Sequence, residues 1–392
     1  MIISPARRLD GLSEYYFSRK LREVRALAAS GRRVINLGIG NPDRPPADAT
    51  IAALGDAAAG PGAHGYQPYT GIPELRRAMS DYYRRVYGVP LDPDGELLPL
   101  IGSKEGIFHI SMAFLDPGDR ALIPDPGYPG YSGATRLAGG EPLRYDLDER
   151  NGWLPDPEVL ARMNLRRVKL MWINYPHMPT GAVADAAALA PLIDFCRETG
   201  ILLCHDNPYS RILTERPFSI LSVPGSRPAC LELNSLSKSH HMPGWRVGLV
   251  AGAPEYLETI LRVKSNVDSG MFRPVQAAAI AALATDDAWH AAQNALYARR
   301  RRAVRAMLES LGFATAPDSA GLFVWGKAPD TVPDVEAFLD DLLQRTGIFF
   351  APGRVFGHNG SRYARASLCA PDADIDLAIA TLSSTFHPEE TA

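Results

Sequence analysis

The segment LNSLSKSHHMPGWRVGLVAG (residues 233–252) contains the features that decide the fold. It closes on the apolar run VGLVAG (247–252), and it begins where the apolar run CLEL (230–233) ends. Between the two runs lies a polar loop with Lys238, and Arg246 follows eight residues later. Uninterrupted apolar runs are typical of strands that are covered on both faces of a sheet. The segment therefore predicts two buried strands with a lysine in their polar connection.

Similar apolar runs recur along the chain and alternate with segments of helical periodicity. The other strand candidates are RVINLG (33–38), ALIP (121–124), VKLMWI (168–173) and ILLCH (201–205). Helix candidates lie between them, for example a helix opened by Ser103 and an alanine-rich segment after Gly181. This alternation predicts an α/β fold in which helices wrap a parallel sheet.

The last hundred residues have a different pattern. A long helical stretch near 287–311 precedes short apolar runs and two further helices, which is an α+β arrangement. We therefore expect a large domain over residues 47–288, a small domain over 289–392, and an N-terminal segment, 1–46, that packs with the small domain. In that segment, residues 13–29 have helical periodicity, with Ser13 as N-cap and Gly31 as stop.

Composition narrows the class of protein. The formal net charge is -3 and no basic stripe is visible, which argues against a nucleic-acid partner. The four cysteines are scattered without metal-ligand spacing, so we expect no metal site. Cys196 and Cys204 lie in apolar surroundings, and we expect these two to be buried reduced thiols. The N-terminus lacks the apolar core of a signal peptide, and no apolar run approaches the ~20 residues that span a bilayer. We expect a soluble cytoplasmic protein.

The surroundings of Lys238 indicate pyridoxal 5'-phosphate (PLP) chemistry. A lysine amine can hold the PLP aldehyde as a Schiff base. Ser235 and Ser237 flank the lysine with hydroxyls, and Arg246 offers a planar fork of charged donors for a phosphate. An isolated lysine between serines is more often an exposed loop residue. The sequence Gly-Trp-Arg, which ends eight residues after Lys238, favours a lysine that binds a cofactor over an exposed loop lysine.

A second polar segment, HDNPYS (205–210), directly follows the apolar run ILLC. Asp206 is then at the carboxyl end of a strand, where open α/β sheets bind ligands. A carboxylate beside the pyridine nitrogen of PLP keeps that nitrogen protonated. Tyr209 could donate to the ring oxygen. A simple capping turn explains this segment equally well when it is taken alone.

Two further segments complete the candidate site. In IGSKEGIFH (101–109), a helix begins at Ser103, and helix N-termini bind phosphate through free N–H groups. Lys104 adds a charge or a backbone contact. In DPGYPGY (125–131), Tyr128 follows a strand and could stack on the cofactor ring. An ordinary N-cap and a space-filling tyrosine are the plainer interpretations.

Together these segments resemble the fold-type I aminotransferases of classes I and II, from about residue 35 to residue 369. The resemblance rests on an ordered set of motifs: GYQPYTG (65–71), GSKEG (102–106), PGYP (126–129), PTG (179–181), DNPY (206–209), SLSK (235–238), GWRVG (244–248) and RAS (365–367). GSKEG and EYYF (14–17) look most similar to the group that contains LL-diaminopimelate and aspartate aminotransferases. The resemblance implies a mostly parallel seven-stranded sheet sandwiched by helices, plus a smaller α+β domain.

The resemblance also implies roles for individual residues. Lys238 would carry PLP and shuttle a proton, and the residues named above would surround the cofactor. Arg365 would clamp the substrate α-carboxylate, Gly40 would let backbone approach the substrate, and Tyr15 might touch it. Tyr66 would reach the phosphate of a neighbouring subunit, so the active site would belong to a homodimer.

One departure from the family pattern concerns the ring oxygen of the cofactor. Related enzymes have asparagine directly before Pro-Thr-Gly, but in NYPHMPTG (174–181) that place next to the cofactor is taken by Met178. Methionine cannot donate a hydrogen bond to the oxygen. Either Tyr209 makes this contact alone, or His177 or Asn174 reaches it through a shifted loop.

The implied reaction moves an amino group from an L-amino acid to a 2-oxo acid, with 2-oxoglutarate as the expected acceptor, in a ping-pong sequence. The same fold also contains PLP-dependent β-lyases and decarboxylases, which remain an alternative. A ligand-binding regulator is a remote alternative, because only about thirty residues precede the first strand.

A few residues outside these motifs also attract attention. His240 and His241 follow the lysine, and we expect them to contact solvent or the edge of the cofactor. His109 lies on the helix that Ser103 opens and is interpreted as a core or interface residue. The basic run 299–302 is interpreted as a solvated helix face.

Overall fold

The computed structural model describes residues 2–386 except 11, 13 and 15. A seven-stranded sheet forms the centre of the larger part of the molecule, as predicted. Six strands are parallel to one another, and only β8 runs in the opposite direction, between β2 and β7. In spatial order the strands are β2 (Leu97–Leu100), β8 (Gly248–Gly252), β7 (Cys230–Ser235), β6 (Leu202–Asp206), β5 (Val168–Ile173), β3 (Arg120–Asp125) and β4 (Glu141–Asp146).

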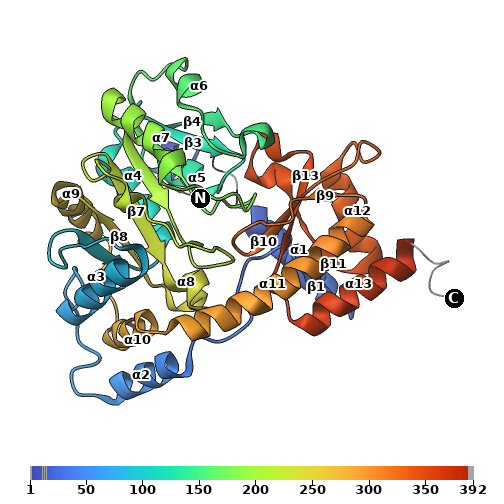
Figure 1. Cartoon of the computed structure of the whole chain (residues 1–392), viewed down its shortest axis with the longest axis horizontal. Helices are drawn as coiled ribbons and strands as arrows, with labels where there is room; N and C mark the ends of the chain where they lie inside the picture. The colour runs from blue at the N-terminus through green and yellow to red at the C-terminus, as the bar shows by residue number, and fades with distance from the viewer. Residues whose placement is uncertain (1, 11, 13, 15, 387–392) are drawn as a thin grey trace.

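Helices cover both faces of this sheet (Figure 1). Successive side chains of a strand point to opposite faces, so Leu170 and Met171 of β5 belong to different hydrophobic clusters. One face packs against α4 (Ser103–Phe114), α5 (Gly130–Leu137) and α9 (Pro254–Lys264). The other face packs against α3 (Pro73–Tyr87), α7 (Ala186–Thr199) and α10 (Arg273–Leu283), and α2 (Asp48–Ala59) lies against α10. This two-sided burial explains why the strands read as uninterrupted apolar runs.

The smaller part is built around a four-stranded antiparallel sheet. Its strands are, in order, β12 (Ala351–Pro352), β13 (Tyr363–Ser367), β10 (Phe323–Lys327) and β9 (Ala314–Thr315). Three helices accompany it: α11 (Asp287–Ser310), α12 (Val335–Thr346) and α13 (Asp372–Phe386). Figure 1 shows α11 running from the neighbourhood of α10 into this smaller part.

The N-terminal segment lies against the smaller part of the molecule. Strand β1 (Ile35–Asn36) pairs in parallel with β11 (Ile348–Phe349). Phe17, from α1 (Tyr16–Ala29), joins the hydrophobic cluster of the smaller part. Gly31 follows α1 with a positive φ of 88°, which suits the predicted helix stop, whereas the predicted N-cap Ser13 lies outside the described residues. The domain boundaries proposed from the sequence stay a prediction.

The basic run 299–302 was interpreted wrongly at one position. Arg299 is exposed, but Arg300 is buried and forms ion pairs with Asp43 and Asp372. Those carboxylates come from chain segments far from α11 in sequence, so the run itself could not indicate them. None of the helices in the described part of the chain is long and apolar enough to cross a membrane.

Candidate active site

The polar segments singled out from the sequence meet at one edge of the large sheet. Parallel strands end at the same edge, and β6 ends there with Asp206 while β7 leads into the short helix α8 (Leu236–Ser239) that carries Lys238. Because β8 runs the other way, Arg246, just before it, lies at this edge too. A cavity of about 480 Å³ opens here. It is lined by predicted residues: Gly40, Ser103, Lys104, Tyr128, Met178, Asp206, Tyr209, Ser235, Ser237, Lys238, Arg246 and Arg365.

The amine of Lys238 lies inside this cavity and donates a hydrogen bond to the carbonyl oxygen of Gly40. Burial lowers the pKa of Lys238, and the positive charges of Arg365 and Arg246 also lower it. A lysine of lowered pKa has more of the neutral amine that acts as a nucleophile. A Cβ at Gly40 would lie 2.2 Å from the ring of Phe323, so the close packing of this backbone on Phe323 requires glycine.

One end of the cavity presents donors suited to a phosphate. Helix α4 begins here after Gly102, whose φ of 87° lies in the left-handed region that favours glycine. A Cβ at Gly102 would lie 2.2 Å from the guanidinium of Arg246, so this arginine packs directly over the helix N-terminus. The hydroxyl of Ser103 is buried and has no hydrogen-bond partner among the described residues. Arg246 Nη1 lies 3.4 Å from the hydroxyl of Ser237, and Ser235 caps the N–H of Ser237.

The opposite end of the cavity contains a buried carboxylate. Asp206 Oδ2 accepts a hydrogen bond of 2.9 Å from the hydroxyl of Tyr131, while Oδ1 has no partner in the described part of the chain. Burial raises the pKa of Asp206 to about 6, and the Tyr131 bond acts in the opposite direction. The sequence reasoning missed Tyr131. Its position three residues after Tyr128, at the beginning of the helix that follows, was the available signal.

Arg365, on β13, is enclosed by aromatic rings. Its guanidinium carbon lies 3.8 Å from the ring centroid of Phe323, 4.5 Å from that of Phe356 and 5.4 Å from that of Phe17. Nη2 donates to the carbonyl of Gly38 at 2.6 Å. The rings fix the plane of the guanidinium, which suits bidentate binding of a carboxylate. The sequence reasoning did not single out these three phenylalanines.

The loop that contains Met178 has a defined arrangement. Asn174 uses its amide to hold the loop, because Nδ2 donates to the backbone carbonyl of Asp206 at 2.6 Å and Oδ1 accepts from the backbone N–H of Met178 at 2.8 Å. His177 hydrogen-bonds the threonine three residues on and does not line the cavity. The thioether of Met178 lies 3.1 Å from Nη1 of Arg365. Of the three candidates for the ring oxygen, Tyr209 is therefore the best placed.

This geometry agrees with the comparisons. The model of the family described as aminotransferase class I and II matches residues 32–382. The chain belongs to this family. Among its relatives is an LL-diaminopimelate aminotransferase of Desulforudis audaxviator (strain MP104C), 43% identical over 368 residues, which are 93% of this chain and 94% of the relative. Another of that name, from Dehalococcoides mccartyi (strain ATCC BAA-2266 / KCTC 15142 / 195), is 39% identical and covers 97% of this chain and 98% of its own.

Solved structures of the same fold include two informative neighbours. Apo-BacF from Bacillus subtillis superposes with a TM-score of 0.94 at 34% identity and covers 99% of both chains. The aspartate aminotransferase of Thermus thermophilus with maleate has a TM-score of 0.91 at 26% identity and covers 98% of this chain and 100% of its own. The protein is thus an aminotransferase of classes I and II, a family of enzymes that use PLP to transfer amino groups.

Two predicted residues of this aminotransferase lie away from the cavity or outside the description. Tyr66 is 91% exposed, in the loop between α2 and α3, and does not line the cavity. That loop packs on the segment before α10, since the rings of His64 and Phe272 stack at 5.9 Å. Tyr15 lies outside the described residues.

The histidines that follow the lysine were interpreted wrongly. His240 and His241 are both buried and pack against α11 rather than against solvent. The ring of His240 meets His290 edge-on at 4.9 Å, and His241 Nε2 hydrogen-bonds the hydroxyl of Tyr297 at 3.0 Å. Helix α11 of the aminotransferase therefore braces the loop after Lys238, through contacts that the local sequence could not show.

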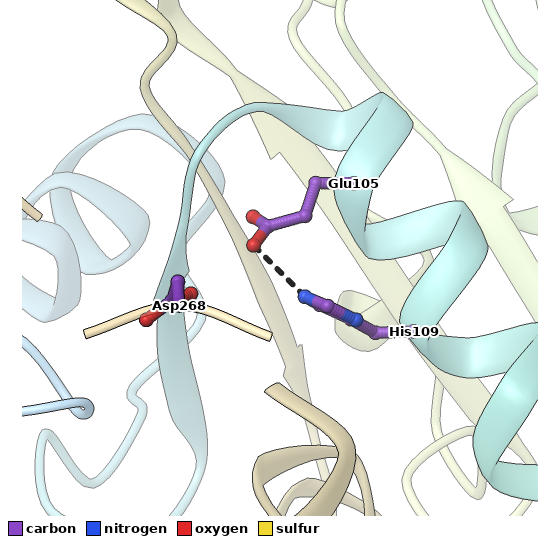
Figure 2. Close-up of side chains that lie close together, drawn as sticks. All are labelled: Glu105, His109 and Asp268. Atoms are coloured by element: carbon purple, nitrogen blue, oxygen red, sulfur yellow. Dashed lines mark hydrogen bonds and ion pairs between the residues drawn. The ribbon is translucent and has the colours of Figure 1, made fainter. Parts of the chain in front are cut away.

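Outside the cavity, Glu105, His109 and Asp268 form a cluster that supports the end of the cavity with donors suited to a phosphate (Figure 2). Glu105 accepts from the backbone N–H of Ile101, and its other oxygen bonds His109 at 2.8 Å. Asp268 lies beside them and accepts from Lys264 at 2.7 Å and from a backbone N–H two residues on. Although the ligand atoms lie within 4.8 Å of one another, all four carboxylate oxygens already have protein donors. The cluster fixes the turn before α4, and it gives no support for a metal site.

Proposed function

We propose that the chain is a PLP-dependent aminotransferase in which Lys238 holds the cofactor covalently. One observation carries the proposal: a single cavity contains an amine of lowered pKa and, buried nearby, a carboxylate oxygen without a hydrogen-bond partner among the described residues. A buried carboxylate oxygen without a donor is costly unless a ligand supplies one. The protonated nitrogen of a pyridine ring is such a donor. When bound, PLP supplies an electron sink for the carbanion that forms at the substrate Cα.

The residues at each end of the cavity fit separate parts of the cofactor. Asp206 would hold the ring nitrogen protonated, Tyr128 would stack on the ring, and Tyr209 would donate to the ring oxygen, with Met178 beside it. The phosphate would lie at the N-terminus of α4, where donors of three kinds converge: backbone N–H groups, hydroxyls and cations. The side chains in that group are Ser103, Lys104, Ser235, Ser237 and Arg246.

The remaining residues of the cavity would bind and process the amino acid. Arg365 would take the α-carboxylate as a bidentate fork, and Gly40 would let the backbone approach the substrate. This would hold the Cα–H bond near Lys238, whose amine is set free when the amino group of the substrate takes its place on the cofactor. The free amine would then remove the proton as a general base and return it as a general acid. The second half of the reaction, with 2-oxoglutarate as the proposed acceptor, reverses these steps.

The proposal includes a homodimer and a candidate donor. The ring of Tyr66 is exposed, and it would reach the phosphate end of a second copy. Tyr15 would reach the substrate from the N-terminal segment. LL-diaminopimelate is the first donor to test, because relatives of 39% and 43% identity carry that name.

The test is spectroscopic and chemical. Purified protein should bind PLP and acquire its visible absorbance, and an amino donor alone should convert the cofactor to its aminated form. Lys238→Ala should lose both properties, while the exposed control Lys327→Ala should keep them. A Lys238→Ala protein that still transfers amino groups would refute the assignment. Release of ammonia or carbon dioxide without amination of the cofactor would indicate a lyase or a decarboxylase instead.

A further inference from the structure

The two oxygens of the Asp206 carboxylate have different surroundings. Oδ2 accepts the hydroxyl of Tyr131 at 2.9 Å, and Oδ1 has no hydrogen-bond partner among the described residues. Asp206 lines the cavity, whereas Tyr131 is fully buried and does not. Among the residues that line the cavity, Tyr131 hydrogen-bonds Asp206 and packs against the ring of Tyr128.

Tyr131 is itself held rigidly. Its ring stacks on the indole of Trp172, with centroids 5.1 Å apart and planes 5° from parallel. Tyr128 meets it edge-on at 5.4 Å. Tyr128 lies just before α5 and Tyr131 lies in its first turn, where the backbone N–H of Tyr131 donates to the carbonyl of Tyr128 at 3.3 Å, so one short segment supplies both a ring that lines the cavity and the donor to Asp206. The donor thus has little freedom to follow a moving carboxylate.

We propose that Tyr131 is a positioning residue, which fixes the Asp206 carboxylate so that Oδ1 meets the protonated nitrogen of the bound pyridine ring. The inference rests on the proposed function and adds a residue that touches neither cofactor nor substrate. A carboxylate tethered at one oxygen cannot rotate away from the ring. The tether also favours the ionised form, since a hydrogen bond to a charged acceptor stabilises that form.

The charges around Asp206 set the direction of the expected effect. Burial raises the pKa of Asp206, and the hydrogen bond from Tyr131 is the larger of the two influences that lower it, ahead of His205 on the same strand. In the same cavity lie the amine of Lys238, from α8, and the hydroxyl of Tyr209. Removing the Tyr131 hydroxyl should therefore raise the pKa of Asp206 further. Because only the ionised carboxylate holds the ring nitrogen protonated, activity should be lost at a higher pH on the acid side.

The experiment compares Tyr131→Phe with Tyr145→Phe in the cofactor-loaded enzyme. Tyr145 is an equally suitable buried tyrosine, 3% exposed, and its hydroxyl donates to the backbone carbonyl of Trp172 at 2.8 Å without any link to Asp206. We would measure kcat and KM of the amino donor from pH 5 to pH 9. A lost hydrogen bond to a charged group predicts a kcat about tenfold to a hundredfold lower, and an acid limb about one pH unit higher, for Tyr131→Phe. The KM of the donor should change less than about twofold, because Arg365 is untouched.

The outcomes separate this inference from the proposed function. Tyr145→Phe should retain the wild-type acid limb, and both variants should unfold near the wild-type temperature. The inference is overturned when the acid limb of Tyr131→Phe coincides with that of Tyr145→Phe, or when kcat and stability fall together in both variants. Failure of the proposed function has a different signature, because the wild-type protein would then show no cofactor absorbance at any pH.

Discussion

Four buried histidines should make the fold lose stability steeply as the pH falls from 7 to 5. Burial lowers the pKa of His177 to about 3, of His290 to about 3 and of His241 to about 4, and it holds the pKa of His240 well below its ordinary value. The unfolded chain binds these protons near pH 6.5 and the folded chain does not. Stability is therefore complete above pH 6.5 and is lost as the pH falls below it.

The magnitude follows from the linkage between protonation and folding. Each imidazole contributes about 1.4 kcal/mol per pH unit, or about 2 kcal/mol between pH 6.5 and pH 5. Together the four should remove about 8 kcal/mol, which is comparable with the total stability of about 5–15 kcal/mol of an ordinary fold. Asp206 acts in the opposite direction, because burial raises its pKa to about 6 in the folded state. Its protonation on acidification returns about 1.4 kcal/mol at pH 5.

The assay is proton uptake on urea unfolding of the apoenzyme, followed at pH 5 and at pH 7.5 in a pH-stat. At pH 5 we expect unfolding to take up about three protons in net. About four protons bind to the imidazoles, and about one is released from Asp206. His290→Asn should lower the uptake by about one. Trp289→Phe is its control, because Trp289 packs against His290 at 5.0 Å but carries no titratable group. An uptake near zero at pH 5, or an unchanged uptake in His290→Asn, would contradict the reasoning.

Other perturbations test individual contacts of the site. Arg365→Lys should raise the KM of the amino donor about tenfold or more, measured by steady-state kinetics, because lysine cannot reproduce the fork that the aromatic rings hold. Ser103→Ala should weaken PLP binding about tenfold in a titration but leave the melting temperature of the apoenzyme unchanged, since its buried hydroxyl has no partner among the described residues. Asp43→Asn should raise the KM of the amino donor several-fold, whereas Asp372→Asn should not. Both carboxylates pair with Arg300, but only Asp43 belongs to the chain segment that contains Gly38 and Gly40. Mixing inactive Lys238→Ala and Tyr66→Ala chains should restore one of the two sites in each mixed dimer, about a quarter of all sites in an equal mixture, if Tyr66 serves the partner's phosphate. No recovered activity would argue against a shared site.

The sequence was most informative where a function depends on contiguous residues. Lys238, Ser235 and Ser237 lie within four positions of each other, and Asp206 directly follows an apolar run. The residue pattern of each such segment can be recognised by itself. The parallel sheet then brings the carboxyl ends of its strands to one edge. Five strands of the large sheet, β3 and β5 to β8, could be predicted from their apolar runs, because two-sided burial leaves such runs. The number seven came from the family resemblance, and β4, which is mostly exposed or half-buried, left no apolar run.

Contacts between distant segments could not be predicted in this way. Arg300 pairs with Asp43 across 257 positions of sequence, and a basic run on a helix carries no sign of a carboxylate so far away. His240 and His241 were expected to contact solvent or the edge of the cofactor, because the helix that covers them begins more than forty residues later. Tyr131 was missed for a different reason. A buried tyrosine on an apolar helix face looks like core, and only its hydrogen bond to Asp206 reveals another role.

The described structure also shows how Lys238 and Arg365 are held in the cavity. Lys238 donates to the carbonyl of Gly40, and Arg365 donates to that of Gly38, so both are held by one short backbone segment. A carbonyl is a neutral acceptor, and replacing it with a carboxylate gains a stronger, charge-assisted bond. Arg300, through Asp43, anchors the same segment to α11. Under the proposed function, the anchored segment would orient both side chains, and an incoming amino acid would replace the segment's carbonyl on Arg365, an exchange that recurs in every half-reaction.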